Sequence, residues 1–325
     1  MSLPYSLRLA CLCLAAFFFV QLTIGVAVLM LSPAIIRRAK RMEAAQAAML
    51  LFVARLVPAL SGAAFVLLIC LPSYLMFESE GATEQVGAWC VGGALICLLS
   101  WGYAIARTAR AAVCSVQYLH QCRRQALAPR KAGDPAALWV LNDCSPGLAL
   151  LGIFQPRFVV SARLVQVLPA EEFSAALRHE QAHWSARDNL KRLLFLLTPC
   201  PLPFSAFGRL EREWARFAEW AADDRAVEGD PRLSLFLAAA LVRVARLGLK
   251  PTLSPLTSTL VGSRCDLAER VQRLLDVRPS PPRSALLPTG LITTGGVLLA
   301  ITVLPIMTDT STLNWFHLVL ESLMH

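Results

Sequence analysis

The chain has 325 residues, of which 56% are hydrophobic and only 16% are charged, whereas about a quarter of the residues in an average soluble domain are charged. This composition excludes an ordinary soluble globular protein. The net charge of +9 raises the question of nucleic-acid binding. The basic residues, however, are spread among acidic ones instead of being clustered with aromatic side chains, so we expect no direct contact with nucleic acid.

Four long segments contain no Asp, Glu, Lys or Arg, and each exceeds the roughly 20 residues that cross a bilayer as a helix: 9–36, 56–77, 85–106 and 284–308. The sequence therefore predicts an α-helical membrane protein with four transmembrane helices. Three of them fall within residues 1–106, at about 9–32, 56–77 and 85–106. A cleavable signal peptide is the alternative for the first segment, but that segment exceeds the usual apolar core of about 7 to 15 residues, so we expect it to be retained.

The basic residues are distributed unevenly around these segments. Of the 31 Lys and Arg residues, 30 lie either between the first and second segments or in the region 107–283. Because cytoplasmic loops are enriched in Lys and Arg, we predict that residues 107–283 form a cytoplasmic domain. The N-terminus, the loop 78–84 and the tail 309–325 are then predicted to be extracytoplasmic, and membrane lipid is an expected partner.

Ten cysteines occur in the chain, and no two of them form a C-x-x-C pair. Five lie in region 107–283, which would face a reducing cytoplasm. The other five lie in the predicted spans: Cys11, Cys13, Cys70, Cys90 and Cys97. The sequence therefore predicts free, buried thiols and no cysteine metal cluster.

Region 107–283 is long enough for one folded domain. Apolar runs at 138–141 and 158–161, bounded by turn residues, predict short strands. The second run is either an ordinary strand of a sheet or an edge strand that pairs with an extended peptide. Pro169 and the acidic residues after it begin a first helix. Three more helices are predicted at Arg209–Val227, Leu233–Leu247 and about Asp266–Leu275.

The uncharged stretch Leu193–Gly208 follows the first of these helices. Because it has 16 residues and three prolines, it is too short and too broken to span the bilayer. It either lies against the membrane surface or forms a buried loop. Arg55, at the start of the second span, is interpreted as an anchor whose side chain reaches the membrane interface.

The first predicted helix contains the pattern H-E-x-x-H at His179–His183. Residues four apart project from one face of a helix, so both histidines can direct a ring nitrogen at one zinc ion. Glu180 lies about 100° around the helix, beside the open coordination position. Zinc lowers the pKa of a bound water, and Glu180 can accept its proton during attack on a peptide bond. The plain alternative is a surface helix with two unrelated histidines.

A catalytic zinc site needs a third protein ligand, and no third histidine follows nearby, so we expect a carboxylate. The second predicted helix offers several acids: Glu211, Glu213, Glu219, Asp223 and Asp224. Spacing alone does not choose among them. Glu219 lies in mid-helix, where it could reach inward, and Asp223 lies one turn later on the same face, where it could support a histidine ring.

Several segments together resemble the BlaR/MecR-type integral-membrane zinc metallopeptidases: Gly152–Pro156, Phe158–Ser161, Pro169–Phe173, His179–His183 with Arg187-Asp188-Asn189 after it, and Glu219–Asp223. The resemblance covers roughly residues 115–280. The order of three spans, a protease domain and a fourth span is also similar. The resemblance implies a mainly α, α+β zincin-like (gluzincin) metalloprotease domain.

The same resemblance implies a role for each residue of the site. The zinc ligands would be His179, His183 and Glu219. Glu180 would be the catalytic general base, and Asp188 and Asp223 would support the ligands. Arg270, in a segment that also resembles the family, is expected to pack or to form an ion pair. Ala222 departs from the family, because a cysteine often precedes the aspartate there.

The implied function is that of a zinc-dependent endopeptidase in a bacterial inner membrane, with its active site facing the cytoplasm. Its substrate would be a cytoplasmic protein such as a transcriptional repressor, with a signal relayed through the spans or by a separate sensor partner. Neither the S-x-x-K nor the K-T-G motif of the family's penicillin-sensor domain occurs here, so we do not expect this polypeptide alone to sense β-lactams. Two alternatives stay open: an HtpX-like quality-control protease, and a non-proteolytic signalling or scaffold subunit.

Overall fold

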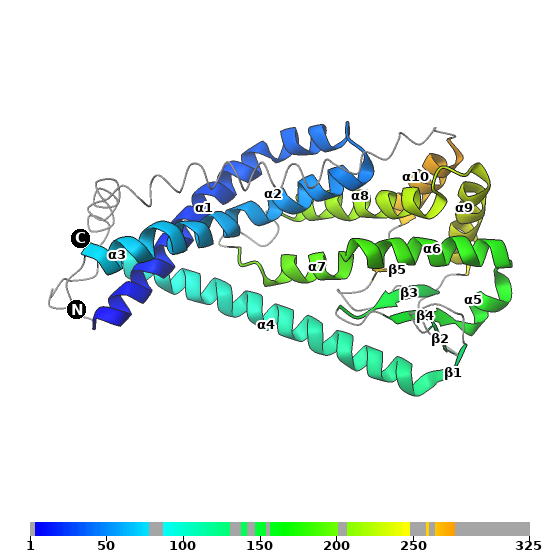
Figure 1. Ribbon diagram of the computed structural model, residues 1–325, viewed down its shortest axis with the longest axis horizontal. Coiled ribbons are helices and arrows are strands. Elements are labelled where there is room, and N and C mark those ends of the chain that lie inside the picture. The colour runs from blue at the N-terminus through cyan, green and yellow to red at the C-terminus, as the bar shows by residue number, and fades with distance from the viewer. Residues whose placement is uncertain are drawn as a thin grey trace.

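A computed structural model of the chain describes residues 4–77, 87–130, 138–141, 147–153, 157–200, 207–247, 258–259 and 264–276. The predicted fourth span, 284–308, and the tail, 309–325, lie outside these residues. Within them, three long helical stretches are long and apolar enough to cross a membrane. They form one half of an elongated molecule, and a small sheet with further helices forms the other half (Figure 1).

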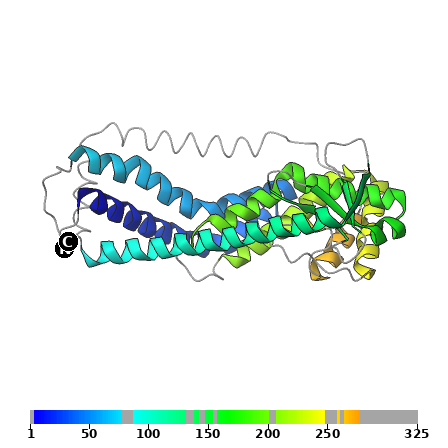
Figure 2. The ribbon, with the colours of Figure 1, turned by 90° about the horizontal axis from the view of Figure 1, so that it is seen from below.

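The three candidate spanning helices extend well beyond the apolar segments of the sequence. Helix α1 is Tyr5–Ala39, and α4 is Ala88–Gln125. Between them, α2 (Ala44–Phe65) continues through the π-helical turn Val66–Cys70 into α3 (Leu71–Phe77). Helix α2 therefore begins 12 residues before the apolar segment that starts at residue 56, and α4 continues 19 residues past residue 106. These extensions run from the bundle into the sheet-containing half (Figure 2).

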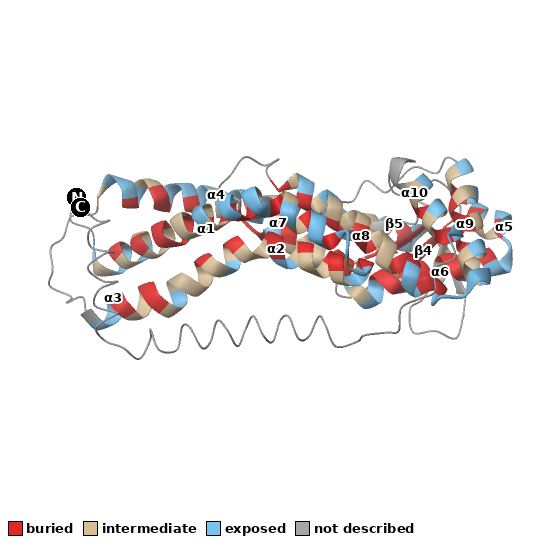
Figure 3. Ribbon diagram, turned by 90° about the horizontal axis from the view of Figure 1, so that it is seen from above, coloured by how far each residue is buried: buried red, intermediate tan, exposed pale blue. Residues whose placement is uncertain are grey.

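Small residues let the three helices approach one another closely. A Cβ atom added at Gly62 of α2 would lie 3.1 Å from the carbonyl oxygen of Phe17, and one added at Gly93 of α4 would lie 3.4 Å from the Cβ of Ala15. Such small-residue contacts are typical of helix packing in membranes. Large apolar side chains such as Met30 and Leu99 are instead exposed, as expected for contact with lipid. Figure 3 shows exposed positions in pale blue along the helices of the bundle.

In the described residues, five short strands form one mixed sheet in the order β1-β2-β4-β3-β5. Their bounds are Ala126–Arg130, Leu138–Leu141, Leu148–Leu151, Arg157–Ser161 and Ser258–Thr259, from β1 to β5. Strand β4 pairs with β2 in parallel and with β3 antiparallel. It is therefore a central strand, and the interpretation of 158–161 as an edge for a peptide is wrong. The reason is β3, which occupies the other side of β4.

Six helices complete the described chain: α5 (Ala162–Val167), α6 (Ala170–Ala186), α7 (Asp188–Leu197), α8 (Gly208–Val227), α9 (Pro231–Arg246) and α10 (Arg264–Leu275). The four helices predicted for this region correspond to α6, α8, α9 and α10. The first part of the stretch Leu193–Gly208 is not a loop, because residues 193–197 belong to α7; its placement against the membrane surface stays a prediction. Helix α7 packs on α4 and α2, and Arg107 of α4 donates hydrogen bonds to the carbonyl oxygens of Phe195 and Leu196.

Two hydrophobic clusters position the helices that carry the candidate site. The first joins the sheet to α6 and α9, through strand residues such as Phe158 and Val160, while the alternating residue Val159 faces α4 on the other side. The second cluster joins α8 to α1 and α2, through Trp214, Phe217 and their neighbours. Helices α6 and α8 therefore lie side by side, one fixed to the sheet and the other to the bundle.

Candidate metal centre

Helix α6 is fixed at its start and faces α8 along its length. Pro169 is its N-cap, and Glu171 and Glu172 lie in the first turn, where acidic side chains favour the positive end of the helix dipole. The carboxylate of Glu172 also accepts hydrogen bonds of 2.9 and 3.0 Å from Arg243 of α9. Further along α6, the side chains of His179, Glu180 and His183 are almost completely buried.

The structure brings His179 and His183 of α6 together with Glu219 of α8, and we call these three residues the metal centre. Their donor atoms all lie within 4.8 Å of one another. The two Nε2 atoms are 3.1 Å apart, and the Glu219 oxygens lie 3.5 Å from His179 Nε2 and 3.6 Å from His183 Nε2. Two zinc–nitrogen bonds of about 2.0–2.1 Å at a tetrahedral angle require a separation of roughly 3.3 Å. The group could therefore hold a metal ion.

Each histidine ring is oriented by a buried carboxylate on its outer nitrogen. His183 Nδ1 lies 2.7 Å from Asp188 Oδ2, and His179 Nδ1 lies 2.9 Å from Asp223 Oδ1. A carboxylate at Nδ1 favours the tautomer with hydrogen on Nδ1, which leaves the Nε2 lone pair available to an ion. Both contacts are therefore of the kind that supports ligands in histidine metal sites. Lys191 extends the contact at His183, because its Nζ donates a hydrogen bond of 2.9 Å to the Asp188 carboxylate.

Arg270 of α10 is a further member of the site. Its guanidinium donates two hydrogen bonds to Asp223, at 2.7 and 2.8 Å, and its Nη1 lies 3.0 Å from Glu219 Oε2. Only 2% of its side chain is exposed. Arg270 therefore forms the ion pair that the sequence interpretation allowed, and it does so with two acids of the site at once.

Burial and charge act in opposite directions on the titrating groups of the site. Burial on its own would lower the pKa of His183, but the nearby Glu219 and the hydrogen bond to Asp188 outweigh it and raise that pKa to about 10. Burial likewise opposes the charged form of Glu219, yet His183 and Arg270 hold its pKa well below the usual range. In the metal-free site the Glu219 carboxylate is therefore held ionised and the pKa of His183 is raised, so an entering cation would displace a proton from this ring.

Glu180 lies beside His179 on α6 and is completely buried. Its negative charge is one of the influences that raise the pKa of Arg270, so the two groups interact electrostatically. The carboxylate that follows the first histidine is thus enclosed with the metal centre and not on a solvated helix face. This burial removes the plain alternative of an exposed helix with unrelated histidines.

The other acids of α8 lie outside the site. Glu211 accepts a hydrogen bond from Arg55 of α2, Glu213 pairs with Arg216, and Asp224 pairs with Arg273. Arg55 is therefore not an anchor reaching the membrane interface. Its side chain is 4% exposed and lies over the ring of Phe207, because α8 packs against the extended start of α2.

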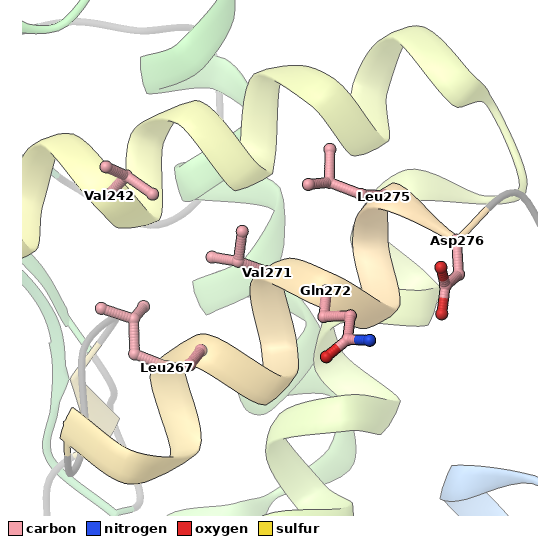
Figure 4. A pocket seen from close by; sticks show the side chains of 7 residues that line it. Val242, Leu267, Val271, Gln272, Leu275 and Asp276 are labelled. Carbon is pink, nitrogen blue, oxygen red and sulfur yellow. The ribbon is translucent and has the colours of Figure 1, made fainter.

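Among the described residues, one cavity borders the metal centre and another is lined by none of its residues. One of about 240 Å³ borders His183 on its Asp188 side and is lined also by Trp184 and Asn189. The other, of about 590 Å³, lies between α9 and α10 and is lined mainly by aliphatic side chains such as Val242 and Val271 (Figure 4). No histidine lines this second cavity, so the chemistry belongs beside the first.

Sequence reasoning named the metal centre and allowed an ion pair for Arg270 without naming its partners, but it missed the contact of Lys191. Arg270 lies 47 residues from Asp223 and on another helix, and Lys191 is one of several cations after the motif. The only available signal was the resemblance of the segment around Arg270 to the family. Comparison of the chain with models of known protein families and with curated proteins finds no match.

Proposed function

We propose that this protein is a membrane-embedded, metal-dependent endopeptidase of the BlaR/MecR type. The observation that carries the proposal is the pair of His Nε2 atoms, 3.1 Å apart, within an H-E-x-x-H helix, with Glu219 beside them and each Nδ1 held by a carboxylate. Such a donor set, with nitrogen and oxygen ligands and a carboxylate next to it in the sequence, is typical of metal-assisted peptide hydrolysis.

His179, His183 and Glu219 would hold the ion, and their atom types suit zinc. When bound there, the ion would act as a Lewis acid that polarises water and the peptide carbonyl. Asp188 and Asp223 would keep both rings in the orientation that the ligands need. Arg270 would position Glu219 by pairing with one of its oxygens, which leaves the other available to the ion.

Glu180 would move the proton. As general base it would accept a proton from the attacking water, and as general acid it would deliver that proton to the leaving amine. Its complete burial strengthens its electrostatic interactions, since water does not screen the carboxylate there.

The charge distribution along the chain supports a position of this site on the cytoplasmic side of a bacterial inner membrane. The substrate class is accordingly a cytoplasmic protein, such as a transcriptional repressor. Helix α8, which contains Glu219, packs directly on α1 and α2. A movement of these two helices in the membrane would therefore act on the helix of Glu219.

The decisive experiment is a substrate trap with the Glu180→Gln variant of the full-length protein. The variant is expressed in cells, bound proteins are cross-linked to it, and the complexes are purified. We expect the variant to keep the zinc content of the wild type, and cleavage of each captured protein to fall by about 10²–10⁴-fold. Glu171→Gln, an exposed acid on the same helix, serves as the matched control and should leave cleavage unchanged.

Zinc content is measured by atomic emission, and cleavage by mass spectrometry of the purified substrate. Unchanged cleavage by the Glu180→Gln variant would overturn the assignment. A protein chain that binds no divalent metal at all would favour the scaffold subunit. Capture of many unrelated misfolded proteins, each cut by the wild type, would favour the HtpX-like alternative over a dedicated repressor protease.

A further inference from the structure

Four cysteines form two close pairs at the end of the helical bundle that lies away from the sheet (Figure 1). The Sγ atoms of Cys13 on α1 and Cys70 in the π-helical turn are 3.8 Å apart. The Sγ atoms of Cys11 on α1 and Cys90 on α4 are 3.9 Å apart. We call this region, defined by Cys11, Cys13, Cys70 and Cys90, the thiol end.

The two pairs use opposite sides of α1. Cys11 and Cys13 are two residues apart on α1, so their side chains point about 200° apart around the helix. One therefore faces α4 and the other faces α2 and its continuation. A single four-cysteine metal cluster would need all four sulfurs to converge on one point. Here the sulfurs form two pairs on different sides of α1.

Local features of the backbone bring each pair together. Gly93, one turn after Cys90, lets α4 approach Ala15, one turn after Cys11. In the π-helical turn the N–H of Leu71 bonds to the carbonyl of Val66, five residues back. The following Pro72 has no N–H to continue a normal helix. This extra residue in the turn rotates Cys70 by about 100° relative to a regular helix, onto the face that meets Cys13.

We propose that the thiol end is a site of oxidative modification, at which Cys11–Cys90 and Cys13–Cys70 form two interhelix disulfides. A disulfide has sulfurs about 2.05 Å apart, so each pair must close by roughly 1.8 Å, which is within the reach of side-chain rotation. Since the loop next to this end, 78–84, carries acidic but no basic residues, the charge distribution predicts that it faces the extracytoplasmic side, where disulfides persist.

The co-reactant is a protein or small-molecule disulfide of that compartment. The half-buried thiol of each pair, Cys11 or Cys13, attacks the reagent as a thiolate, forms a mixed disulfide and releases one reagent thiol. Its buried partner, Cys90 or Cys70, then attacks the protein sulfur and releases the second reagent thiol. Each protein pair loses two protons and two electrons, and each reagent disulfide gains them.

The consequence is a bundle in which α1 is covalently joined to both of its neighbours at one end. Oxidation would fix the separation of α1 from α4 and from the π-helical turn, while reduction would leave that contact to packing alone. The sequence interpretation of free thiols would then describe the reduced state.

The test uses the full-length protein in lipid nanodiscs, treated with oxidised glutathione and compared with a sample kept in reductant. Thiols are counted after denaturation with a maleimide reagent, and disulfide-linked peptides are identified by mass spectrometry. We expect the number of reactive thiols to fall by at least four from the original ten, with links at Cys11–Cys90 and Cys13–Cys70. The wild-type protein alone decides the result, so the outcome does not depend on a variant folding.

Serine variants assign the links. Cys13→Ser should abolish only the link at Cys70, and Cys11→Ser only the link at Cys90. Cys114→Ser, which removes an exposed cysteine of α4, is the matched control and should keep both links. Ten reactive thiols after oxidation, adducts of glutathione at these cysteines without cross-links, or links between other cysteines would each overturn the proposal.

Discussion

The metal centre and the thiol end are stabilised in opposite ways. The metal centre concentrates buried charge, with Asp223, Glu219 and Arg270 in direct contact. The thiol end contains no such network among its four cysteines, which pack in a cluster with apolar and aromatic side chains such as Leu12 and Tyr74. A buried charge without its partner is costly, whereas a small side chain in a close contact can be changed with a limited effect. Substitutions should therefore differ strongly in effect between the two regions.

The largest effect is expected from Arg270→Ala. It leaves the buried Asp223 and the 15% exposed Glu219 without their cation, so the free energy of unfolding of the metal-free protein should fall by about 3–5 kcal/mol. The measurement is denaturant unfolding in detergent with a chelator present. Arg273→Ala is the matched control, because Arg273 pairs with the half-exposed Asp224 and should cost under about 1 kcal/mol. Equal effects of the two variants would contradict a charge-stabilised centre.

A smaller effect is expected from Asp188→Ala. Without its carboxylate partner the ring of His183 is no longer held in the tautomer that binds metal, so zinc affinity should fall by about 10–100-fold. Competition with a chromophoric chelator measures that affinity. Asp224→Ala removes an acid of α8 outside the site and should leave it unchanged. An Asp188→Ala variant with wild-type affinity would mean that the contact is structural only.

The pH dependence of zinc affinity sharpens the comparison further. The pKa of His183 is raised to about 10 by Glu219 and Asp188 against the effect of burial. Below that pH the ring is protonated and zinc must displace the proton, so affinity should rise by about tenfold per pH unit from pH 7 towards pH 10. Calorimetry in buffers of different ionisation enthalpy counts the released protons. Affinity that is constant over this range would show that the histidines are already neutral.

The smallest effect is expected in the bundle. An alanine at Gly93 would bring its Cβ within 3.1 Å of Phe19, whereas one at Gly92 would meet nothing within 4 Å. Gly93→Ala should therefore be less stable than Gly92→Ala by about 1 kcal/mol, since crowding offsets the gain in helix propensity. Thermal unfolding in detergent compares the two. If Gly93→Ala were as stable as Gly92→Ala, the close approach of α1 and α4 would be looser than described.

The sequence predicted the parts of this fold that depend on local pattern. Uncharged segments indicated the spanning helices, and Pro169 with its following acids indicated α6. The H-E-x-x-H spacing named two histidines that share one helix face, so their convergence needed no tertiary information. By contrast, the choice of Glu219 among five acids came from family resemblance. Helix spacing shows on which face of its own helix a residue lies, but not which other helix packs against that face.

What the sequence could not give are the contacts between distant segments. Strand β3 has the sequence Leu-Ala-Leu-Leu, which lacks the β-branched and aromatic residues that indicate strands. It forms because β4 offers it a partner. Arg55 looked like a membrane anchor until α8 placed Glu211 2.8 Å away. Such pairs follow from the packing of whole helices, and no local pattern in either segment encodes them.

Helix α4 is a single rod of 38 residues, which at 1.5 Å per residue is about 57 Å long. It begins beside the cysteine pairs and ends on the face of the sheet opposite α6. Because a rigid rod has no internal joint, a tilt of about 5° at its first turn would displace its last turn by roughly 5 Å. A movement too small to disturb the packing at one extremity would thus become a shift of about one side chain's length beneath the sheet.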